Sequence, residues 1–325
     1  MIANTLDLLI IGAGPAGLSC GIAAQKAGLS YLIVDKGSIA DSIQKFQREM
    51  YFFSTPELLE IGDIPFIVPT VRPTSLDCVN YYRGVTDHYK LNCAYYEEIS
   101  SVRKGDVHFI VRSKGRSEYT ARAVVVAAGY YDVPNPLGVP GEDLPHITRY
   151  YRDPLPYYQR EVVIVGGKNS AVEAALDLWR HGAKVTVVHR GPTLSGNVKY
   201  WIVPDFENRV ASGAIQFLRN SRVTRFLPGC TEIETEGAVR QIGCDAVFVL
   251  IGYRPDVPFL KSMGVAIDAE SLAPAFNPET YETNVPGLYV AGGIVGGRFN
   301  NKVFIENGRL HGPAIVKHLL SKGKR

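Results

Sequence analysis

LDLLIIGAGPAGLSCGIAAQKAGLSYLIVD, residues 6–35, is the stretch of the chain that decides its fold. Residues 6–11 form a short apolar run typical of a buried strand, and the glycine loop at residues 12–17 follows with the pattern Gly-x-Gly-x-x-Gly. A helix is expected at residues 18–27, ended by Gly28, with a second strand at residues 31–34. This order predicts a parallel βαβ unit that binds a dinucleotide.

Each glycine of the loop has a physical role in such a site. Gly12 permits the tight turn, Gly14 lets the backbone approach a pyrophosphate, and Gly17 lets the helix pack closely on the strand. The N-terminus of the helix then presents free N–H groups and a partial positive charge to the phosphates. Asp35, at the end of the second strand, is placed to accept both ribose hydroxyls. An incidental glycine turn is the alternative interpretation.

A second unit of the same kind lies farther along the chain. A strand is expected at residues 162–165, a glycine turn at Gly166 and Gly167, a helix at about residues 170–181 and a strand at residues 184–188. The spacing from Gly166 to residue 189 equals that from Gly12 to Asp35, which indicates an equivalent second nucleotide site. Lys168 stands where the second glycine of the pattern belongs, so close approach of the pyrophosphate is less assured here.

The residue at the end of the second strand of this unit, where a ribose-binding residue is expected, is basic. His189, followed by Arg190, takes the place that Asp35 holds in the first unit. An arginine suits a 2′-phosphate, because its guanidinium forms charge-assisted, forked hydrogen bonds. We therefore expect NADPH in preference to NADH, and the alternative is that His189 and Arg190 are merely a solvated strand end.

The two units predict an α/β fold of two Rossmann-like (FAD/NAD(P)-binding) domains, with the second domain inserted into the first. The Pro-rich residues 133–140 predict a linker out of the first domain, and residues 253–258 predict the return. A helix is expected at residues 75–89 and strands at residues 107–111 and 119–128. The expected boundaries are 1–135 and 255–325 for the first domain and 136–254 for the second.

Composition excludes several classes of function. The chain has 325 residues and a formal net charge of +3, too small to indicate a nucleic-acid or membrane partner. No apolar run approaches the roughly 18 residues needed to span a bilayer, and the N-terminus does not read as a signal peptide. The five cysteines are odd in number and widely spaced, which favours a reducing cytoplasm over a disulfide framework, and neither they nor the histidines have metal-site spacing.

Further segments resemble one known class of enzyme. With both loops, VVVAAG at residues 124–129, DAVFVLIG at 245–252 and TNVPGLYVAG at 283–292, the chain resembles the thioredoxin-reductase-like flavoproteins. The resemblance implies an FAD domain built from both ends of the chain, an NADPH domain between them and a homodimer. Thioredoxin reductases carry a CxxC motif before the second glycine loop, and this chain has none, so that activity is excluded.

The bacillithiol disulfide reductase family (YpdA) is the more similar one, on the segments at residues 51–66, 150–158, 166–171 and 304–312. In that family a lysine at position 168 is normal, and Gly293 stands where most thioredoxin-reductase-like relatives have an aspartate on the ribityl chain. Many members carry a cysteine in the first loop, where this chain has Ala16, so no catalytic residue is expected of the protein. Cys20, one helical turn away, is interpreted as a small core residue. The cofactor-binding residues that motif and resemblance imply are Gly12, Gly14, Pro15, Ala16, Gly17, Asp35, Lys36, Ser42, Gly129, Gly292, Gly293, Ile294 and Val303 for FAD, and Gly166, Gly167, Lys168, Asn169, Ser170, His189 and Arg190 for NADPH.

Three functions remain open on the sequence. The first is an NADPH-dependent FAD oxidoreductase that reduces a low-molecular-weight disulfide such as bacillithiol disulfide. The second is a ferredoxin or flavodoxin NADP reductase, with a small electron-transfer protein as its partner. The third is a flavin-containing NADPH redox sensor. In all three the cofactors carry the chemistry and the protein orients them. Tyr131 and Tyr51 are weak candidates for stacking on the flavin.

Overall fold

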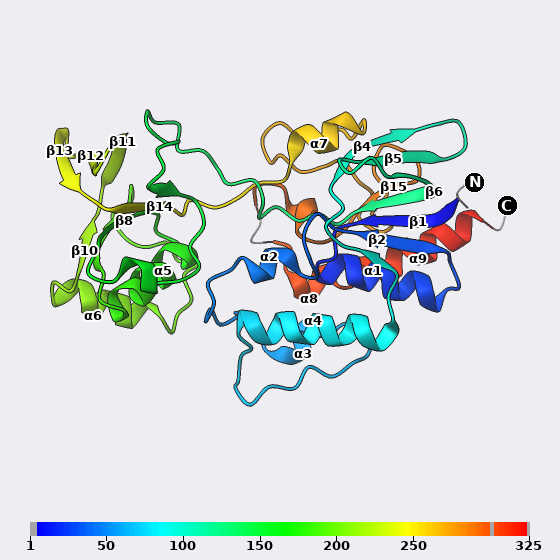
Figure 1. The fold of residues 1–325 in the computed structure, drawn as a ribbon, viewed down its shortest axis with the longest axis horizontal. Helices are drawn as coiled ribbons and strands as arrows, with labels where there is room; N and C mark the ends of the chain where they lie inside the picture. The colour runs from blue at the N-terminus through cyan, green and yellow to red at the C-terminus, as the bar shows by residue number, and fades with distance from the viewer. Residues whose placement is uncertain (1–4, 300–301, 324–325) are drawn as a thin grey trace. The chain divides into compact units, whose positions relative to one another are not determined.

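A computed structural model describes residues 5–299 and 302–323 of the chain. It divides into two compact units, and the first comprises the chain up to Gln44, residues 51–133 and the chain from Tyr253 onward. The second unit comprises residues 134–252 together with residues 45–50. Two α/β units, one inserted into the other, confirm the predicted fold class (Figure 1). Both breaks fall two residues before the expected boundaries, and the short piece at residues 45–50 was not anticipated.

The first unit is built on a seven-stranded sheet with the order β3-β2-β1-β6-β5-β4, in which β15 also pairs with β6. The pairs among β3, β2, β1, β6 and β15 are parallel, whereas β4 and β5 add an antiparallel edge. The strand bounds are β1 Leu6–Ile11, β2 Tyr31–Val34, β3 Cys93–Ala94, β4 Ile99–Lys104, β5 Phe109–Ser113, β6 Glu118–Val126 and β15 Leu288–Val290.

The helices of this unit begin where the sequence supplies start signals. Pro15 occupies the first turn of α1, so this helix starts inside the glycine loop and earlier than expected. Thr74 and Asp77 form a capping box at α4, whose bounds match the expected helix. The helix bounds are α1 Pro15–Lys26, α2 Asp41–Gln44, α3 Pro56–Leu59, α4 Ser75–Tyr89, α7 Val257–Ser262, the 3-10 helix η2 Gly292–Gly296, α8 Ile305–Gly308 and α9 His311–Lys322.

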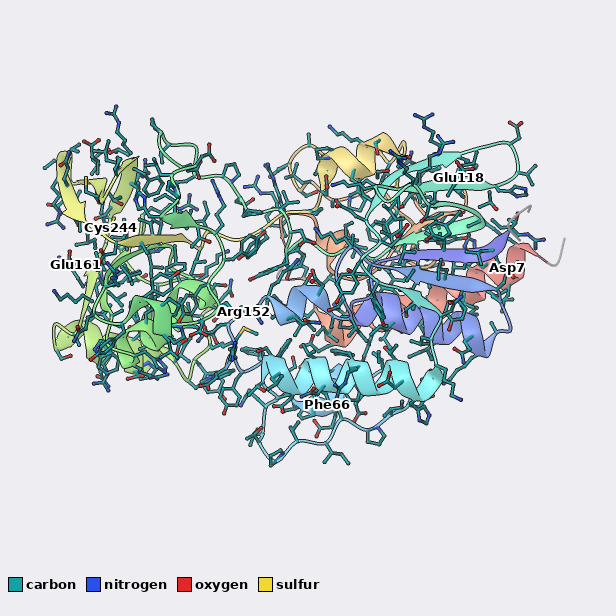
Figure 2. All side chains as sticks on the ribbon, in the orientation of Figure 1. Asp7, Phe66, Glu118, Arg152, Glu161 and Cys244 are labelled. Carbon is teal, nitrogen blue, oxygen red and sulfur yellow. The ribbon has the colours of Figure 1, made fainter. Side chains whose placement is uncertain are left out.

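Aromatic side chains of α4 fasten the preceding segment, residues 59–66. The ring of Phe66, labelled in Figure 2, stacks on that of Tyr81 with 4.2 Å between centroids. The Tyr81 hydroxyl donates to the Ile64 carbonyl at 2.7 Å, and the Tyr82 hydroxyl donates to the Leu59 carbonyl at 2.9 Å. These tyrosines therefore have a packing role, as buried phenols with a hydrogen-bond partner usually do.

The second unit has a parallel sheet of order β10-β9-β8-β14-β7 and a three-stranded antiparallel sheet, β11-β12-β13. One apolar cluster packs one face of the parallel sheet against α5 and α6, and another packs the opposite face against β11 and β12. A sheet covered on both faces explains the continuous apolar runs of its strands. The bounds are β7 Ile147–Thr148, the 3-10 helix η1 Leu155–Tyr157, β8 Glu161–Val165, α5 Asn169–Arg180, β9 Lys184–Val188, α6 Val203–Ala211, β10 Ile215–Leu218, β11 Ser221–Leu227, β12 Cys230–Thr235, β13 Ala238–Gly243 and β14 Ala246–Val249.

Within the residues that the structure describes, no helix has both the length and the hydropathy that a membrane span requires.

Candidate functional site

The first glycine loop lies at the carboxyl end of β1, between β1 and α1. The Gly12 N–H donates to the Val34 carbonyl at 2.7 Å, and the φ of Gly12 is +112°, a conformation that favours glycine. A Cβ on Gly17 would lie 1.8 Å from the Gly12 carbonyl oxygen, so only glycine permits this approach of helix to strand. Around Gly14, by contrast, no described atom lies within 4 Å of where a Cβ would be. The loop is thus closed on its protein side and open at Gly14, as a backbone phosphate cradle requires.

Asp35 fastens the same loop from the end of β2. Its two carboxylate oxygens accept hydrogen bonds from the Ala13 N–H at 2.6 Å and from the Gly37 N–H at 2.8 Å. Burial raises the pKa of Asp35, and the two N–H donors act against that shift. A carboxylate can accept about four hydrogen bonds, so capacity for ribose hydroxyls remains beside this structural role.

Loops from three neighbouring parallel strands, β1, β6 and β15, meet at this edge of the sheet. A Cβ on Gly292 would lie 2.7 Å from the Cβ of Ala16, and a Cβ on Gly293 would lie 2.7 Å from a ring carbon of Tyr130. Gly292 has a φ of +74° and begins η2. The side chain at position 16 therefore lies against the turn that the resemblance assigns to the ribityl chain.

The other residues expected to contact FAD also lie in the first unit. Lys36 forms an ion pair with Asp132 at 3.0 Å, which links the end of β2 to the loop after β6. Gly129, with a φ of +67°, lies in that same loop. The remaining positions are Pro15 in the first turn of α1, Ser42 on α2, Ile294 within η2, and Val303 just before α8.

A buried histidine supports the Gly292 turn from behind. The Nδ1 of His311 accepts the Gly292 N–H at 3.1 Å, and the imidazole stacks on the Tyr281 ring with 4.0 Å between centroids. Burial lowers the pKa of His311 to about 4, so the ring is neutral at physiological pH and can remain an acceptor.

The second glycine loop repeats the backbone arrangement of the first. The Gly166 N–H donates to the Val188 carbonyl at 3.0 Å, and a Cβ on Gly166 would lie 2.6 Å from the Leu250 carbonyl oxygen. Gly167 is needed for a different reason, because a Cβ there would lie 2.3 Å from Nδ1 of His189. The imidazole of His189 thus packs directly against the loop.

Lys168 is the N-cap residue of α5, and its side chain is exposed. A cation at a helix N-terminus is disfavoured by the helix dipole, unless an anion is bound there. Lys168 in place of the second glycine is therefore compatible with a phosphate site. It holds the position that corresponds to Gly14, around which the first loop is open. Ser170, in the first turn of the same helix, is exposed as well.

Asn169 uses its side chain to hold another segment of the chain, residues 195–199. Its Oδ1 accepts the Lys199 N–H at 2.7 Å and its Nδ2 donates to the Asn197 carbonyl at 3.1 Å. The Ser195 N–H donates to the Gly167 carbonyl at 3.0 Å, and the Lys199 ammonium pairs with Glu173 of α5 at 2.5 Å. The segment is thus fastened to both the glycine loop and the helix that follows it.

Arg190 is the charged member of the expected basic pair. Burial, assisted by the charge of Arg190, lowers the pKa of His189, which leaves the imidazole neutral at physiological pH. A second cation follows β10, where the guanidinium of Arg219 lies 4.7 Å from the ring centroid of Phe217. The His189 ring is also stacked with Phe217, at 6.2 Å between centroids. Arg190 and Arg219 therefore flank this strand end, and both side chains are exposed.

None of the thiols for which a pKa shift is resolved is activated. Burial raises the pKa of Cys20 to about 12 and also raises the pKa values of Cys78, Cys93 and Cys244. A thiol attacks a disulfide only as the thiolate. Cys20 has no exposed surface, in agreement with its interpretation as a core residue.

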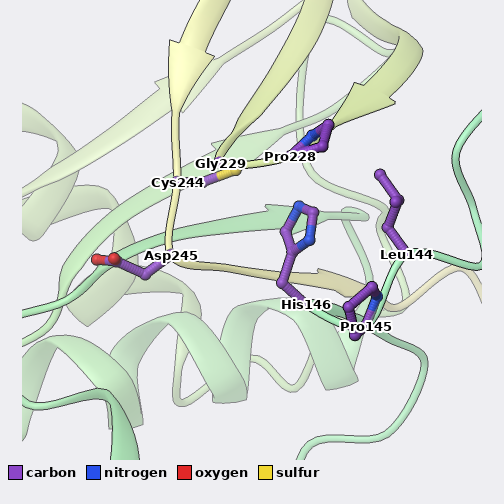
Figure 3. A pocket seen from close by; sticks show the side chains of 7 residues that line it. All are labelled: Leu144, Pro145, His146, Pro228, Gly229, Cys244 and Asp245. Atoms are coloured by element: carbon purple, nitrogen blue, oxygen red, sulfur yellow. The ribbon is translucent and has the colours of Figure 1, made fainter.

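A cavity in the second unit lies away from the predicted nucleotide site. It has a volume of about 460 Å³ and is lined by Leu144, Pro145, His146, Pro228, Gly229, Cys244 and Asp245 (Figure 3). His146 and Asp245 immediately precede β7 and β14, so the cavity is at the amino ends of the parallel strands. Nucleotides bind at the carboxyl ends, where Gly166 and His189 lie.

Three residues of the candidate site were missed in the sequence, namely Tyr130, Arg219 and His311. Tyr130 and Arg219 follow strands whose neighbours in the sheet are distant in sequence, and His311 begins α9. The motif at residues 304–312 was recognised, but nothing in it indicated that His311 would hold Gly292. The strand that follows the second βαβ unit ends just before Arg219. A basic residue at such a strand end is a signal that could have indicated it.

Comparison with known proteins agrees with this arrangement. A family model described as pyridine nucleotide-disulphide oxidoreductase matches residues 9–292. The chain is 40% identical over 315 residues to the bacilliredoxin reductase Bdr of Bacillus subtilis. The matched residues cover 97% of each chain.

Two solved structures are similar over nearly the whole chain. The bacillithiol disulfide reductase Bdr (YpdA) of Staphylococcus aureus is 40% identical, with a TM-score of 0.94 and coverage of 98% of this chain and 99% of that one. The corresponding protein of Bacillus cereus is 39% identical, with a TM-score of 0.95 and coverage of 98% and 100%. The resemblance to the bacillithiol disulfide reductase family is confirmed.

Proposed function

The chain belongs to the pyridine nucleotide-disulphide oxidoreductase family, and from that premise we propose that it transfers electrons from NADPH through FAD to bacillithiol disulfide. It is an oxidoreductase that uses FAD and NADPH. The balanced reaction is NADPH + H⁺ + RSSR → NADP⁺ + 2 RSH. The observation that carries the proposal is the 40% identity, over 97% of both chains, to a bacilliredoxin reductase.

The first unit supplies the residues proposed to hold FAD. The open backbone at Gly14 and the N-terminus of α1 would receive the pyrophosphate, and Asp35 would accept the ribose hydroxyls. The turn at Gly292 and Gly293 would lie along the ribityl chain. FAD, when bound, supplies a group that accepts a hydride and passes two electrons on.

The second unit supplies the residues proposed to hold NADPH. The loop at Gly166 and the N-terminus of α5 would receive the pyrophosphate, with Lys168 adding a positive charge. Arg190 and Arg219 would bind the 2′-phosphate, because an arginine keeps its charge at any physiological pH and His189 is neutral.

The protein itself is proposed to contribute no redox thiol. Position 16, where many family members carry a cysteine, is alanine, and the thiols with resolved shifts all have raised pKa values. A mixed disulfide at position 16 is therefore impossible, and the protein's part is to orient the two cofactors and the substrate.

The test is steady-state oxidation of NADPH by the FAD-loaded enzyme with three separate acceptors: bacillithiol disulfide, a ferredoxin and a flavodoxin. We expect turnover with bacillithiol disulfide only, with two thiols formed per NADPH consumed. Turnover with ferredoxin or flavodoxin only would instead identify an NADP reductase of that kind. Slow reduction of the flavin by NADPH, with no acceptor used, would identify a redox sensor.

We further propose that the chain forms a homodimer through its first unit. Exposed apolar side chains lie on α3, between α3 and α4 and at the start of α4, and exposed apolar patches mark protein–protein interfaces. They are Leu58, Ile67, Val71 and Leu76, with exposed fractions of 47%, 87%, 73% and 60%. Light scattering coupled to gel filtration should give twice the chain mass, and Ile67→Asp should halve it; a monomer in both cases contradicts the proposal.

A cytoplasmic location is proposed on the cysteines, since all five are free thiols. Cell fractionation followed by immunoblotting tests it, and recovery with secreted protein would contradict it.

A further inference from the structure

Tyr130 and Gly293 form a matched pair at the carboxyl edge of the first sheet. Tyr130 follows β6 and Gly293 follows β15, and these strands are parallel neighbours. A Cβ at position 293 would lie 2.7 Å from Cε1 and 2.9 Å from Cδ1 of the Tyr130 ring. The ring thus occupies the space that any side chain at position 293 would need.

Two contacts fix the loop that carries Tyr130. The Val133 N–H donates to the Tyr130 carbonyl at 3.3 Å, and Asp132 of the same loop pairs with Lys36 at the end of β2. These contacts fix the backbone of the loop that carries the ring.

Among the described residues, 5–299 and 302–323, the hydroxyl of Tyr130 has no hydrogen-bond partner. The side chain of Tyr130 is partly buried, and this burial raises the pKa of its hydroxyl. Buried tyrosines usually do hydrogen-bond through the hydroxyl, as Tyr81 and Tyr82 do. The Tyr130 hydroxyl, beside the Gly292 turn, can therefore donate a hydrogen bond to a ligand bound there.

We propose that Tyr130 is a positioning residue for the flavin. Its hydroxyl provides the side-chain hydrogen bond at the ribityl chain that an aspartate at position 293 would otherwise provide, and position 293 is glycine in order to admit the ring. This inference rests on the proposed FAD site. It also identifies a tyrosine other than Tyr131 and Tyr51 as the one beside the flavin.

The experiment measures FAD binding to the apoprotein of the full chain, by the change in flavin fluorescence, with no turnover involved. Tyr130→Phe removes only the hydroxyl and should weaken binding by about fivefold to tenfold, which corresponds to the loss of one hydrogen bond. Tyr151→Phe is the matched control, because its hydroxyl bonds to Asp177 within the second unit, which holds none of the residues proposed to bind FAD. Its affinity for FAD should equal that of the wild type.

A swap tests the pairing of the two positions. Gly293→Asp alone should weaken FAD binding by more than Tyr130→Phe does, since the new side chain collides with the ring. In the double variant Tyr130→Ala/Gly293→Asp the ring is gone and the aspartate can provide the hydrogen bond in its place. This variant should therefore bind FAD within about tenfold of the wild type, the factor that one hydrogen bond contributes. NADP⁺ binding and circular dichroism verify that each variant is folded.

Wild-type affinity in Tyr130→Phe would overturn the proposal, whatever the double variant does, because a space-filling ring needs no hydroxyl. A double variant that binds no better than Gly293→Asp alone would overturn the pairing. Failure of the wild-type apoprotein to bind FAD at all would instead defeat the proposed function, so the two failures are distinguishable.

Discussion

At the scale of single residues, alanine in place of cysteine at position 16 removes the thiol that could form a mixed disulfide there. The Cβ of Ala16 points at Gly292, so a thiol at this position would face the turn proposed for the ribityl chain. The chain keeps this geometry without the sulfur. Cys20, on the next turn of α1, cannot substitute, because it is fully buried and its pKa is raised to about 12.

The choice between NADPH and NADH is expected to depend on two arginines. Replacing Arg190 or Arg219 by alanine should raise KM for NADPH by about tenfold or more, since a charge-assisted hydrogen bond contributes about 1.5–3 kcal/mol. KM for NADH should stay unchanged, because NADH lacks the 2′-phosphate. Steady-state kinetics with both cofactors checks this, and Arg222→Ala, an exposed arginine on β11, is the control. Equal losses with NADH and NADPH would contradict the assignment.

His311 is expected to make the stability of the protein depend on pH. Its pKa is about 4 in the folded protein and about 6.5 when unfolded, so the unfolded state binds more protons between these values. Stability should therefore be fully present above about pH 6.5 and should fall by about 3 kcal/mol as the pH drops to 4.

Urea unfolding of the wild type and of His311→Asn at several pH values measures this contribution. The asparagine can still accept the Gly292 N–H but does not titrate, so its curve should lack that part of the pH dependence. Identical pH dependence in the two proteins would show that His311 is not the group responsible.

At the scale of elements, the segment at residues 195–199 is attached to the second glycine loop and to α5 by hydrogen bonds and an ion pair. Its attachment includes a nearly buried ion pair, Lys199 with Glu173, whose side chains are 6% and 11% exposed. Burial raises the pKa of Glu173 even though Lys199 opposes that shift, so the desolvation of this carboxylate exceeds its attraction to the ammonium.

Breaking this ion pair from one side should be costly. Lys199→Met leaves the Glu173 charge buried without compensation and should lower the free energy of unfolding by about 3–5 kcal/mol. The double variant Lys199→Met/Glu173→Leu should recover much of that loss, because no charge remains to be buried. Chemical denaturation measures both, with Lys184→Met at an exposed ion pair as the control. A double variant as unstable as the single one would contradict this explanation.

At the scale of the whole molecule, one architecture is used twice, with an acidic residue after the second strand of one βαβ unit and a basic segment at the equivalent place in the other. In each unit, a glycine N–H donates to the last residue of the neighbouring strand, Val34 or Val188. Asp35 is the residue proposed for the FAD ribose, whereas the exposed Arg190 and Arg219 are the residues proposed for the NADPH 2′-phosphate. The residues expected to bind FAD and those expected to bind NADPH lie in different units.

The second unit is expected to fold and bind its nucleotide by itself. It has apolar cores on both faces of its own parallel sheet, which a stable domain requires. A fragment of residues 134–252 should therefore unfold cooperatively and bind NADP⁺, but not FAD, in calorimetry. An unfolded fragment, or one that binds FAD, would contradict the domain assignment.

What the sequence by itself determined are the two βαβ units and their glycine loops. The signals are local, because a strand, a tight turn and a helix that opens at the turn depend on residues only a few positions apart. The helix at Ser75–Tyr89 and both loops were located in this way, with helix starts displaced by up to three residues where Pro15 and Asn169 begin their helices earlier.

What only the tertiary structure decided is which side chains from distant segments of the chain meet at each carboxyl edge. Tyr130 reaches Gly293, His311 holds Gly292, and Arg219 joins Arg190 beside a neutral His189. The reason is physical: these contacts depend on the lateral order of the strands and on burial, which moves a histidine's pKa. Neither strand order nor burial can be read from the spacing of residues along the chain.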